Sequence, residues 1–512
     1  MPTNNKTSRQ LNNETTRQQI RNYCVLIKNQ CASEKKLLVM IIILIILLYF
    51  VLLSLYSRIA TGRNATNETF FRGNRRSPWY MVAFGMIGAS VSGITFVSVP
   101  GMVIKSDMTY LQTCLGFIFG YIAVAFILLP IYYRLNLTTI YSYLKDRLGQ
   151  RAYKTGAGFF LLSKLTGAAA RFYVVCIMLQ AFVFDDLGIP FFLTVIGMVA
   201  LIWVYTRSGG IKTLVWTDTL QTVCMFAALG LIIYNVAGRL DMSLAEAFSA
   251  VWNDSHSRVF EFSDFVSRQN FWKQFLSGIF IVIVMTGLDQ DMMQKNLTCK
   301  NLRDAQKDMC TYGVAFVPAN LLFLCLGVML MMLTSKMGMA LPESSDELLP
   351  MFAASGLLGT PVLIFFTIGL MAASFSSADS ALTALTTSYC VDVCEKPKDE
   401  GLRKRVHIGM ALAFVVCILL FRVFNSTSLI DAIYVMCSYT YGPLLGLFAF
   451  GLITRKRIND RYVPFIAIAS PLLCFALDTV TTQYLGYHFG YELLMLNGLI
   501  TFGGLYCCKE KC

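Results

Sequence analysis

Three apolar stretches of this sequence are interrupted by polar residues that could do chemistry. Arg171 lies near the middle of one stretch, and Asp218 lies inside another. A third stretch contains a compact polar cluster made of Ser376, Ser377, Asp379 and Ser380. Ionisable side chains within membrane-length apolar segments are costly and face a partner, an ion or a substrate. Binding of ions or of a charged solute is therefore the chemistry that these residues favour.

The cluster at 376–380 has the composition of a site for a hard cation. Ser376 and Ser380 are four residues apart, so they share one face of a helix, and Ser377 adjoins that face. Hydroxyl and carboxylate oxygens suit an alkali cation better than a transition metal. Serines that bond back to their own helix are the alternative interpretation, but an aspartate within the same turn favours the ion site.

Arg171 and Asp218 each have a functional and a structural interpretation. The guanidinium fork of Arg171 matches the two oxygens of a substrate carboxylate, and Asp218 could serve as a cation ligand or proton carrier. Alternatively, Arg171 pairs with an acidic residue on another span, and Asp218 is a candidate for that partner. Lys164, seven residues before Arg171, is expected to extend its ammonium toward the inner membrane surface.

The stretch 83–101 predicts a helix that is broken inside the membrane. Five helix-weakening residues punctuate it: Gly85, Gly88, Gly93, Pro100 and Gly101. Irregular backbone at membrane depth is tolerated where it is buried in protein or lines a cavity, and a broken helix is typical of a transporter binding site. Close packing of a glycine-rich helix against its neighbours is the alternative. A second break is predicted at 287–291, where a glycine precedes Asp289, Gln290 and Asp291.

The elements that must position these residues are membrane-spanning helices. The chain has 512 residues, of which 56% are apolar and 14% charged, and its mean hydropathy is +0.59. Stretches near the length needed to cross a bilayer recur along the chain. The predicted spans are about 37–57, 79–103, 110–133, 155–183, 189–206, 213–238, 272–294, 309–334, 357–391, 406–424, 428–453, 462–482 and 486–507. The fold class is therefore an all-α polytopic membrane protein with about thirteen helices.

Lysines and arginines gather in alternate loops, which predicts an odd number of spans and a cytoplasmic C-terminus. Lys295 is counted here among the inner-loop charges. The net charge of +13 is thereby attributed to membrane topology and gives no reason to expect nucleic acid. The polar tail 1–36 is basic, yet this topology places it outside, so the natural start is either Met1 or Met40.

Four motifs together resemble the sodium:solute symporter family. They are SGGIKTLVWTDTLQ at 208–221, AASFSSADS at 372–380, NRRSPWY at 74–80 and GASVSGITF at 88–96. The resemblance implies a LeuT-type core of 5+5 inverted repeats over 79–453. It also implies one extra N-terminal helix at 37–57 and two extra C-terminal helices within 462–507. Sodium-driven uptake by alternating access is the implied activity.

The resemblance also assigns site residues. The family's common sodium site implies the carbonyls of Gly88, Val91 and Ala373 with the hydroxyls of Ser376 and Ser377. The second sodium site of some members implies Asp218, Ser376 and Ser380. Asp379 departs from the Ser or Thr expected there, and it either strengthens that site or carries a proton. By similarity to the family's sialic acid transporters, Ser92, Thr95, Gln112 and Arg171 would bind the substrate.

The sequence therefore predicts sodium-coupled symport of a carboxylate-bearing solute, a sialic acid or related sugar acid, with one or two Na⁺. The alternatives are a proton- or sodium-coupled carrier of a neutral sugar, amino acid or vitamin, and a sensor or channel that binds without pumping. No enzyme activity is expected, because no catalytic motif is evident. The expected setting is a lipid bilayer, the bacterial inner (plasma) membrane, with a monomer as the functional unit.

Overall fold

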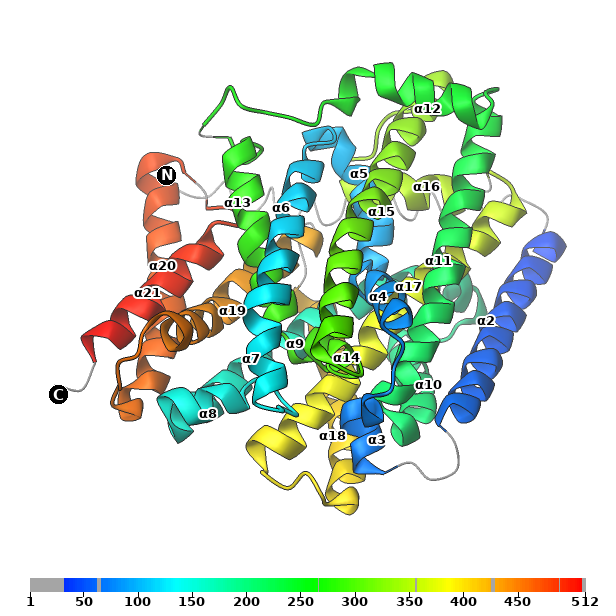
Figure 1. Ribbon diagram of the computed structural model, residues 1–512. Helices are drawn as coiled ribbons and strands as arrows, with labels where there is room; N and C mark the ends of the chain where they lie inside the picture. Colours follow the sequence, from blue (N-terminus) through cyan, green and yellow to red (C-terminus); the bar gives the residue numbers. More distant parts are fainter. Residues whose placement is uncertain are drawn as a thin grey trace, which may run out of the picture.

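The computed structural model describes residues 32–61, 66–265, 267–354, 357–424, 429–487 and 489–508. Within these ranges the regular structure is helical (Figure 1). This follows from the apolar sequence, because a helix satisfies its own backbone hydrogen bonds where lipid offers none. The predicted tail 1–36 overlaps the described residues only at its end, where α2 begins at Ala32.

Among the described residues, nine helices are long and apolar enough to cross a membrane. Two bent helix pairs pass the same test together, and two shorter apolar helices complete the set. The all-α polytopic class is confirmed, whereas the count of thirteen spans stays a prediction, because the two shorter helices fall below the length criterion. The main helices are α2 (Ala32–Thr61), α4 (Trp79–Ser90), α5 (Gly93–Ser106), α6 (Tyr110–Ala123), α9 (Gln150–Leu179), α10 (Phe191–Gly209), α11 (Ile211–Arg239), α13 (Phe271–Val282), α14 (Gln290–Asn296), α15 (Leu302–Lys336), α17 (Thr360–Ser388), α18 (Glu400–Phe424), α19 (Leu429–Ile453), α20 (Val463–Leu485) and α21 (Leu493–Cys507).

Short helices connect the spans on both membrane faces. They include α3 (Asn67–Arg72), α8 (Ser142–Leu148), α12 (Leu244–Asn253) and α16 (Leu348–Ala354). A further short helix, α7 (Leu129–Arg134), continues the span that α6 begins, which runs from Tyr110 to Arg134. The α12 helix lies in the long acidic loop between α11 and α13, and a capping box between Ser243 and Glu246 begins it. This agrees with the solvated character of that loop.

Both predicted helix breaks are confirmed. The axes of α4 and α5 differ by 61° across Val91 and Ser92, and those of the 271–287 helix and α14 differ by 70°. All seven residues of α14 are buried, although five of them are polar or charged. Lys295 is 1% exposed, so counting it as a loop charge was wrong.

The glycines of the first break also permit close packing, so the packing interpretation holds alongside the functional one. A Cβ at Gly88 would overlap Thr222 of α11, and a Cβ at Gly93 would overlap Ser374 of α17. The break is therefore held between two long helices whose polar residues were candidates from the sequence.

The broken helices, α9, α11 and α17 lie toward the centre, whereas α2 and the α20–α21 pair lie at opposite sides of the molecule (Figure 1). Burial follows this arrangement: the apolar window of α17 is 72% buried, and that of α20 is 22% buried. The core residues thus surround the breaks, and the peripheral helices present apolar side chains outward, as expected for a lipid-facing surface.

We expect Gly88→Ala to destabilise the protein by about 1–3 kcal/mol, because the added methyl group would overlap Thr222. Thermal unfolding in detergent measures this effect. Gly158→Ala on α9 is the matched control, because a Cβ there meets no atom within 4 Å. Equal melting temperatures for the two variants would contradict the packing described for the first break.

Candidate substrate and ion sites

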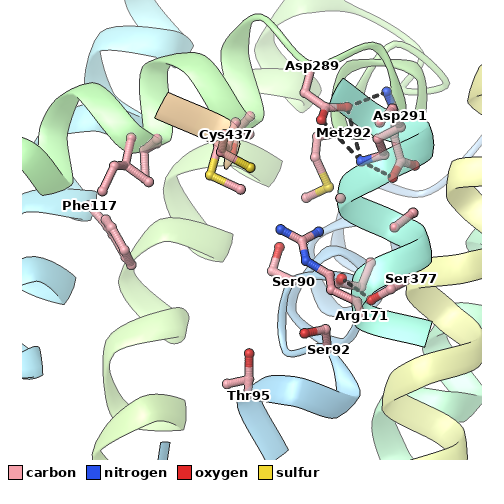
Figure 2. Close-up of a pocket in the computed structure, with 18 of the residues that line it drawn as sticks. Ser90, Ser92, Thr95, Phe117, Arg171, Asp289, Asp291, Met292, Ser377 and Cys437 are labelled. Atoms are coloured by element: carbon pink, nitrogen blue, oxygen red, sulfur yellow. Dashed lines mark hydrogen bonds and ion pairs between the residues drawn. The ribbon is translucent and has the colours of Figure 1, made fainter. Parts of the chain in front are cut away.

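A cavity lies between the two broken helices and is closed laterally by α9, α15, α17 and α19 (Figure 2). Its wall combines aromatic side chains with a few polar ones, which is typical of small-molecule sites. The polar and charged residues of the wall are Ser90, Ser92, Thr95, Tyr110, Tyr121, Ser163, Lys164, Arg171, Thr286, Asp289, Asp291, Tyr312, Ser377 and Tyr441.

Arg171 contributes a positive charge that the surrounding described residues leave unpaired. It lines the cavity together with Ser90, Ser92 and Ser377, as Figure 2 shows. No carboxylate of a described side chain lies within ion-pair distance of Arg171, and Asp218 pairs elsewhere. The predicted Arg171–Asp218 pair is therefore wrong.

The hydroxyls of Ser92 and Thr95 also face this cavity. Neither hydroxyl makes a hydrogen bond to another described residue. Ser92 lies at the break, and Thr95 lies in the first turn of α5. Ser90 differs, since its hydroxyl contacts that of Tyr312, which accepts a hydrogen bond from Tyr121 (2.7 Å). Three of the predicted substrate residues are thus brought together with unused donors.

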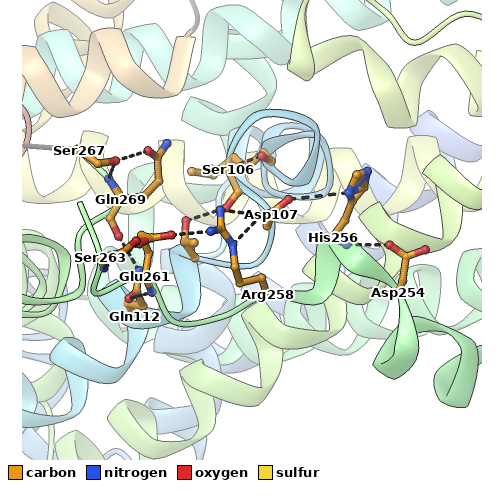
Figure 3. A network of polar contacts seen from close by, with 12 residues as sticks. Ser106, Asp107, Gln112, Asp254, His256, Arg258, Glu261, Ser263, Ser267 and Gln269 are labelled. Atoms are coloured by element: carbon orange, nitrogen blue, oxygen red, sulfur yellow. Dashed lines mark hydrogen bonds and ion pairs between the residues drawn. The ribbon is translucent and has the colours of Figure 1, made fainter. Parts of the chain in front are cut away.

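Gln112, the fourth predicted substrate residue, does not line the cavity. Its side-chain amide donates to the carbonyl of Gln269 (2.9 Å) and its oxygen accepts from the amide of Glu261 (3.1 Å). These contacts belong to a polar network on the outer loop (Figure 3), where hydrogen bonds from Ser263 lower the pKa of Glu261. Gln112 therefore anchors the loop above the cavity in this structure.

Lys164 binds the second broken helix and does not reach the membrane surface, which corrects the expectation from the sequence. Its ammonium lies 2.7 Å from Asp291 and 3.1 Å from Asp289, and Tyr441 donates to Asp289 (2.6 Å). Seven residues of helix separate Lys164 from Arg171, which is about 10 Å along α9. In the predicted topology this cluster closes the inner end of the cavity.

Asp218 is fully buried and pairs with Lys295 on α14. The ammonium of Lys295 is 2.7 Å from Oδ2 of Asp218, and the hydroxyl of Ser376 donates to Oδ1 (2.7 Å). Asp379, one turn further along α17, accepts from Tyr205 (2.7 Å) and from Ser380 (3.3 Å). The residues predicted for a second sodium site therefore lie close to one another. Two further side chains, those of Lys295 and Tyr205, contact the same carboxylates.

Of the residues predicted for the first sodium site, Ser377 reaches the break between α4 and α5, whereas Ser376 donates to Asp218 (2.7 Å). Ser377 donates to the carbonyls of Ala89 (2.8 Å) and Ala373 (3.3 Å). The amide of Ser92, which would bond to Gly88 in an unbroken helix, donates to Ser90 instead (2.9 Å). Helical bonding resumes at Phe96, whose amide donates to Ser92. Among the described residues, no amide outside the regular helices donates to the Gly88 or Val91 carbonyl.

A cavity between two broken helices, lined by a guanidinium that has no carboxylate partner among the described residues, is typical of a secondary transporter. The model of the sodium:solute symporter family matches residues 70–461. The chain belongs to this family and is a sodium-coupled solute symporter, with Na⁺ as the co-transported ion.

Curated relatives and a solved structure agree with this assignment. The chain is 27% identical over 459 residues to the sodium/sialic acid symporter NanT of Aliivibrio fischeri, covering 86% of this chain and 88% of the relative. It is 23% identical to the sodium/sialic acid symporter SiaT of Proteus mirabilis, covering 77% of this chain and 81% of the relative. A substrate-bound outward-open structure of a Na⁺-coupled sialic acid symporter has the same fold, with a TM-score of 0.78, 18% identity and coverage of 92% and 99% of the two chains.

The sequence interpretation missed two buried cations and one phenol. Lys295 and Lys164 were assigned to the membrane surface, and Tyr205 of α10 was not considered. The sequence does carry one signal that this segment is structured and buried. Asp291 and Lys295 are four residues apart next to a break, so they share one face of a helix. Their partners, however, come from α9 and α11, which lie far away in the chain.

We expect Lys164→Ala to destabilise the protein by about 3–5 kcal/mol, because it leaves Asp289 and Asp291 as unpaired buried charges. Thermal unfolding of the purified protein measures the change. Adding Asp289→Asn and Asp291→Asn to the same chain is expected to recover most of the loss.

Lys336→Ala is the control for Lys164→Ala. Its partner, Asp241, is exposed, and the hydrogen bond from Lys336 lowers the pKa of Asp241 without burying either group. An exposed pair contributes little to stability. Similar melting temperatures for Lys164→Ala and Lys336→Ala would argue against a structural role for the buried cluster.

Proposed function

We propose that this protein imports a solute with a carboxylate group, a sialic acid or a related sugar acid, together with Na⁺. The observation that carries the proposal is the unpaired guanidinium of Arg171, which faces the cavity beside the free hydroxyls of Ser92 and Thr95. The sialic acid specificity of NanT and SiaT, as their names state it, supports the same class of solute.

The electrostatics of the cavity favour an anion over a neutral solute. Arg171 is only partly buried in the cavity wall, and no described carboxylate pairs with it, so an anion that enters the cavity can bind its charge. Lys164, the other cation of the cavity wall, is already neutralised by Asp289 and Asp291. A carboxylate could accept two bonds from the guanidinium and others from the hydroxyls. The remaining apolar wall would contact the rest of the solute.

Sodium and solute would meet on the same unwound segment. The first sodium site would use the carbonyls of Gly88, Val91 and Ala373 and the hydroxyl of Ser377. The hydroxyl of Ser376, which donates to Asp218 in this structure, would complete the site after turning to the ion. Ser92 follows Val91 directly, so a sodium ion that orders the break also orders a substrate donor. This shared backbone would couple the two ligands in an alternating-access cycle.

The proposal includes the setting of the protein. We assign the ten-helix core to 79–453 and the additional helices to 37–57 and 462–507. The basic inner loops support a cytoplasmic C-terminus, and the bacterial relatives support a bacterial inner membrane. A monomer with the lipid bilayer as its surroundings is sufficient for this function, with no nucleic acid and no enzymatic step.

Arg171→Ala is expected to lower uptake of a sialic acid by roughly a hundredfold, because two charge-assisted hydrogen bonds are worth about 3 kcal/mol together. Uptake of radiolabelled N-acetylneuraminic acid into proteoliposomes measures this. Arg151→Ala, an exposed position on the same helix, is the control and is expected to leave uptake unchanged. Undiminished uptake by Arg171→Ala would refute the carboxylate assignment.

Ser377→Ala is expected to raise the sodium concentration for half-maximal uptake about tenfold, because it removes one hydroxyl ligand of the first site. Sodium titration of uptake, with choline keeping the ionic strength constant, measures the change. Ser374→Ala is the control, since that hydroxyl bonds to the Leu370 carbonyl of its own helix. If both serine variants keep the wild-type sodium dependence, Ser377 does not bind the ion.

A further inference from the structure

The residues predicted for a second sodium ion enclose the side chain of a lysine. Lys295 lies in the last turn of α14 and is 1% exposed, while Asp218 is fully buried. Their 2.7 Å separation places the ammonium where a cation bound to Oδ2 of Asp218 would lie. Asp218 and Lys295 come from α11 and α14, so this contact exists only in the folded protein.

Three of the four carboxylate oxygens of the cluster accept hydrogen bonds, and the fourth, Oδ2 of Asp218, is in ion-pair contact with Lys295 without accepting a hydrogen bond. Oδ1 of Asp218 accepts from Ser376 and Oδ2 faces Lys295. Oδ1 of Asp379 accepts from Ser380 and Oδ2 accepts from Tyr205. A sodium ion would need several of these oxygens at once and would also meet the like charge of the ammonium. The residues present therefore do not fit a second sodium ion.

We propose that the ammonium of Lys295 permanently replaces the second sodium ion, so that each transport cycle carries a single Na⁺ through the first site. The inference rests on the proposed function, because it specifies the ion stoichiometry of the same transporter. A covalently attached cation neutralises Asp218 without leaving the protein. It therefore ties α14 to α11 and α17 in a way that does not depend on the external sodium concentration.

Direct sodium binding tests the proposal without any solute. Purified wild-type protein is titrated with ²²Na⁺ at constant ionic strength, with choline as the replacement cation. One bound sodium per chain is expected, and Ser377→Ala is expected to weaken that binding about tenfold. Two bound sodium ions in the wild-type protein would overturn the proposal.

A double variant tests whether Asp218 belongs to the sodium site. Lys295→Met with Asp218→Asn replaces the ion pair by neutral side chains of similar size, and it is expected to keep one bound sodium. Loss of sodium binding in this variant, with folding verified by its melting temperature, would show that the pair supplies the first site and would overturn the proposal. This comparison still decides the matter if single variants fail to fold.

The single variant Lys295→Ala tests whether a second sodium ion binds once the ammonium is removed. It removes the ammonium but leaves Asp218, Ser376 and Ser380, so a second sodium ion is expected to bind in the vacated space. The sodium dependence of thermal stability is then expected to become steeper than in the wild-type protein. A folded Lys295→Ala protein that binds one sodium ion with unchanged affinity would contradict the proposal that the ammonium of Lys295 replaces a second sodium ion.

These outcomes separate the inference from the proposed function. One bound sodium without uptake of a sialic acid would refute the proposed substrate and leave the role of Lys295 supported. Sodium-dependent uptake of a sialic acid with two bound sodium ions would support the proposed substrate and refute the role of Lys295. Absence of sodium binding in the wild-type protein would refute both.

Discussion

Charges in the membrane interior need partners, and α14 is held in place by this requirement. A seven-residue helix with five polar or charged residues could not be buried on its own. Asp289 and Asp291 bind Lys164 of α9, and Lys295 at the other end binds Asp218 of α11. The two contacts position the second broken helix, and that position determines one wall of the cavity. Arg171 is the exception, because its partner is proposed to be the transported solute.

The first broken helix combines two demands on the same residues. Small side chains at Gly88 and Gly93 allow α11 and α17 to approach closely, and the interrupted ladder leaves the Gly88 and Val91 carbonyls available. A polar side chain from each neighbouring helix then meets the break, as Ser377 does at Ala89. Close packing and the proposed ion binding therefore both depend on one irregular segment.

Much of the fold and part of the site could be predicted from the sequence. The helical class, both breaks and the grouping of Ser92, Thr95 and Arg171 are present in the structure. The partners of the buried charges could not be predicted, because Asp218 and Lys295 lie on different spans that the long loop between α11 and α13 separates in the chain. Lys295 also resembled an ordinary inner-loop charge, and Gln112 resembled a site residue although it binds the loop around Glu261.

The sequence by itself determined that this is a helical membrane protein with two helix breaks and polar residues beside them. These properties depend on local composition, since apolar length selects the membrane and glycine weakens the helical ladder. Only the tertiary structure decided which charges neutralise one another among the described residues. That choice depends on distances between helices far apart in the chain. It pairs Lys295 with Asp218, at the place expected for a cation, and it gives Arg171 a place in the cavity wall without a carboxylate partner among the described residues.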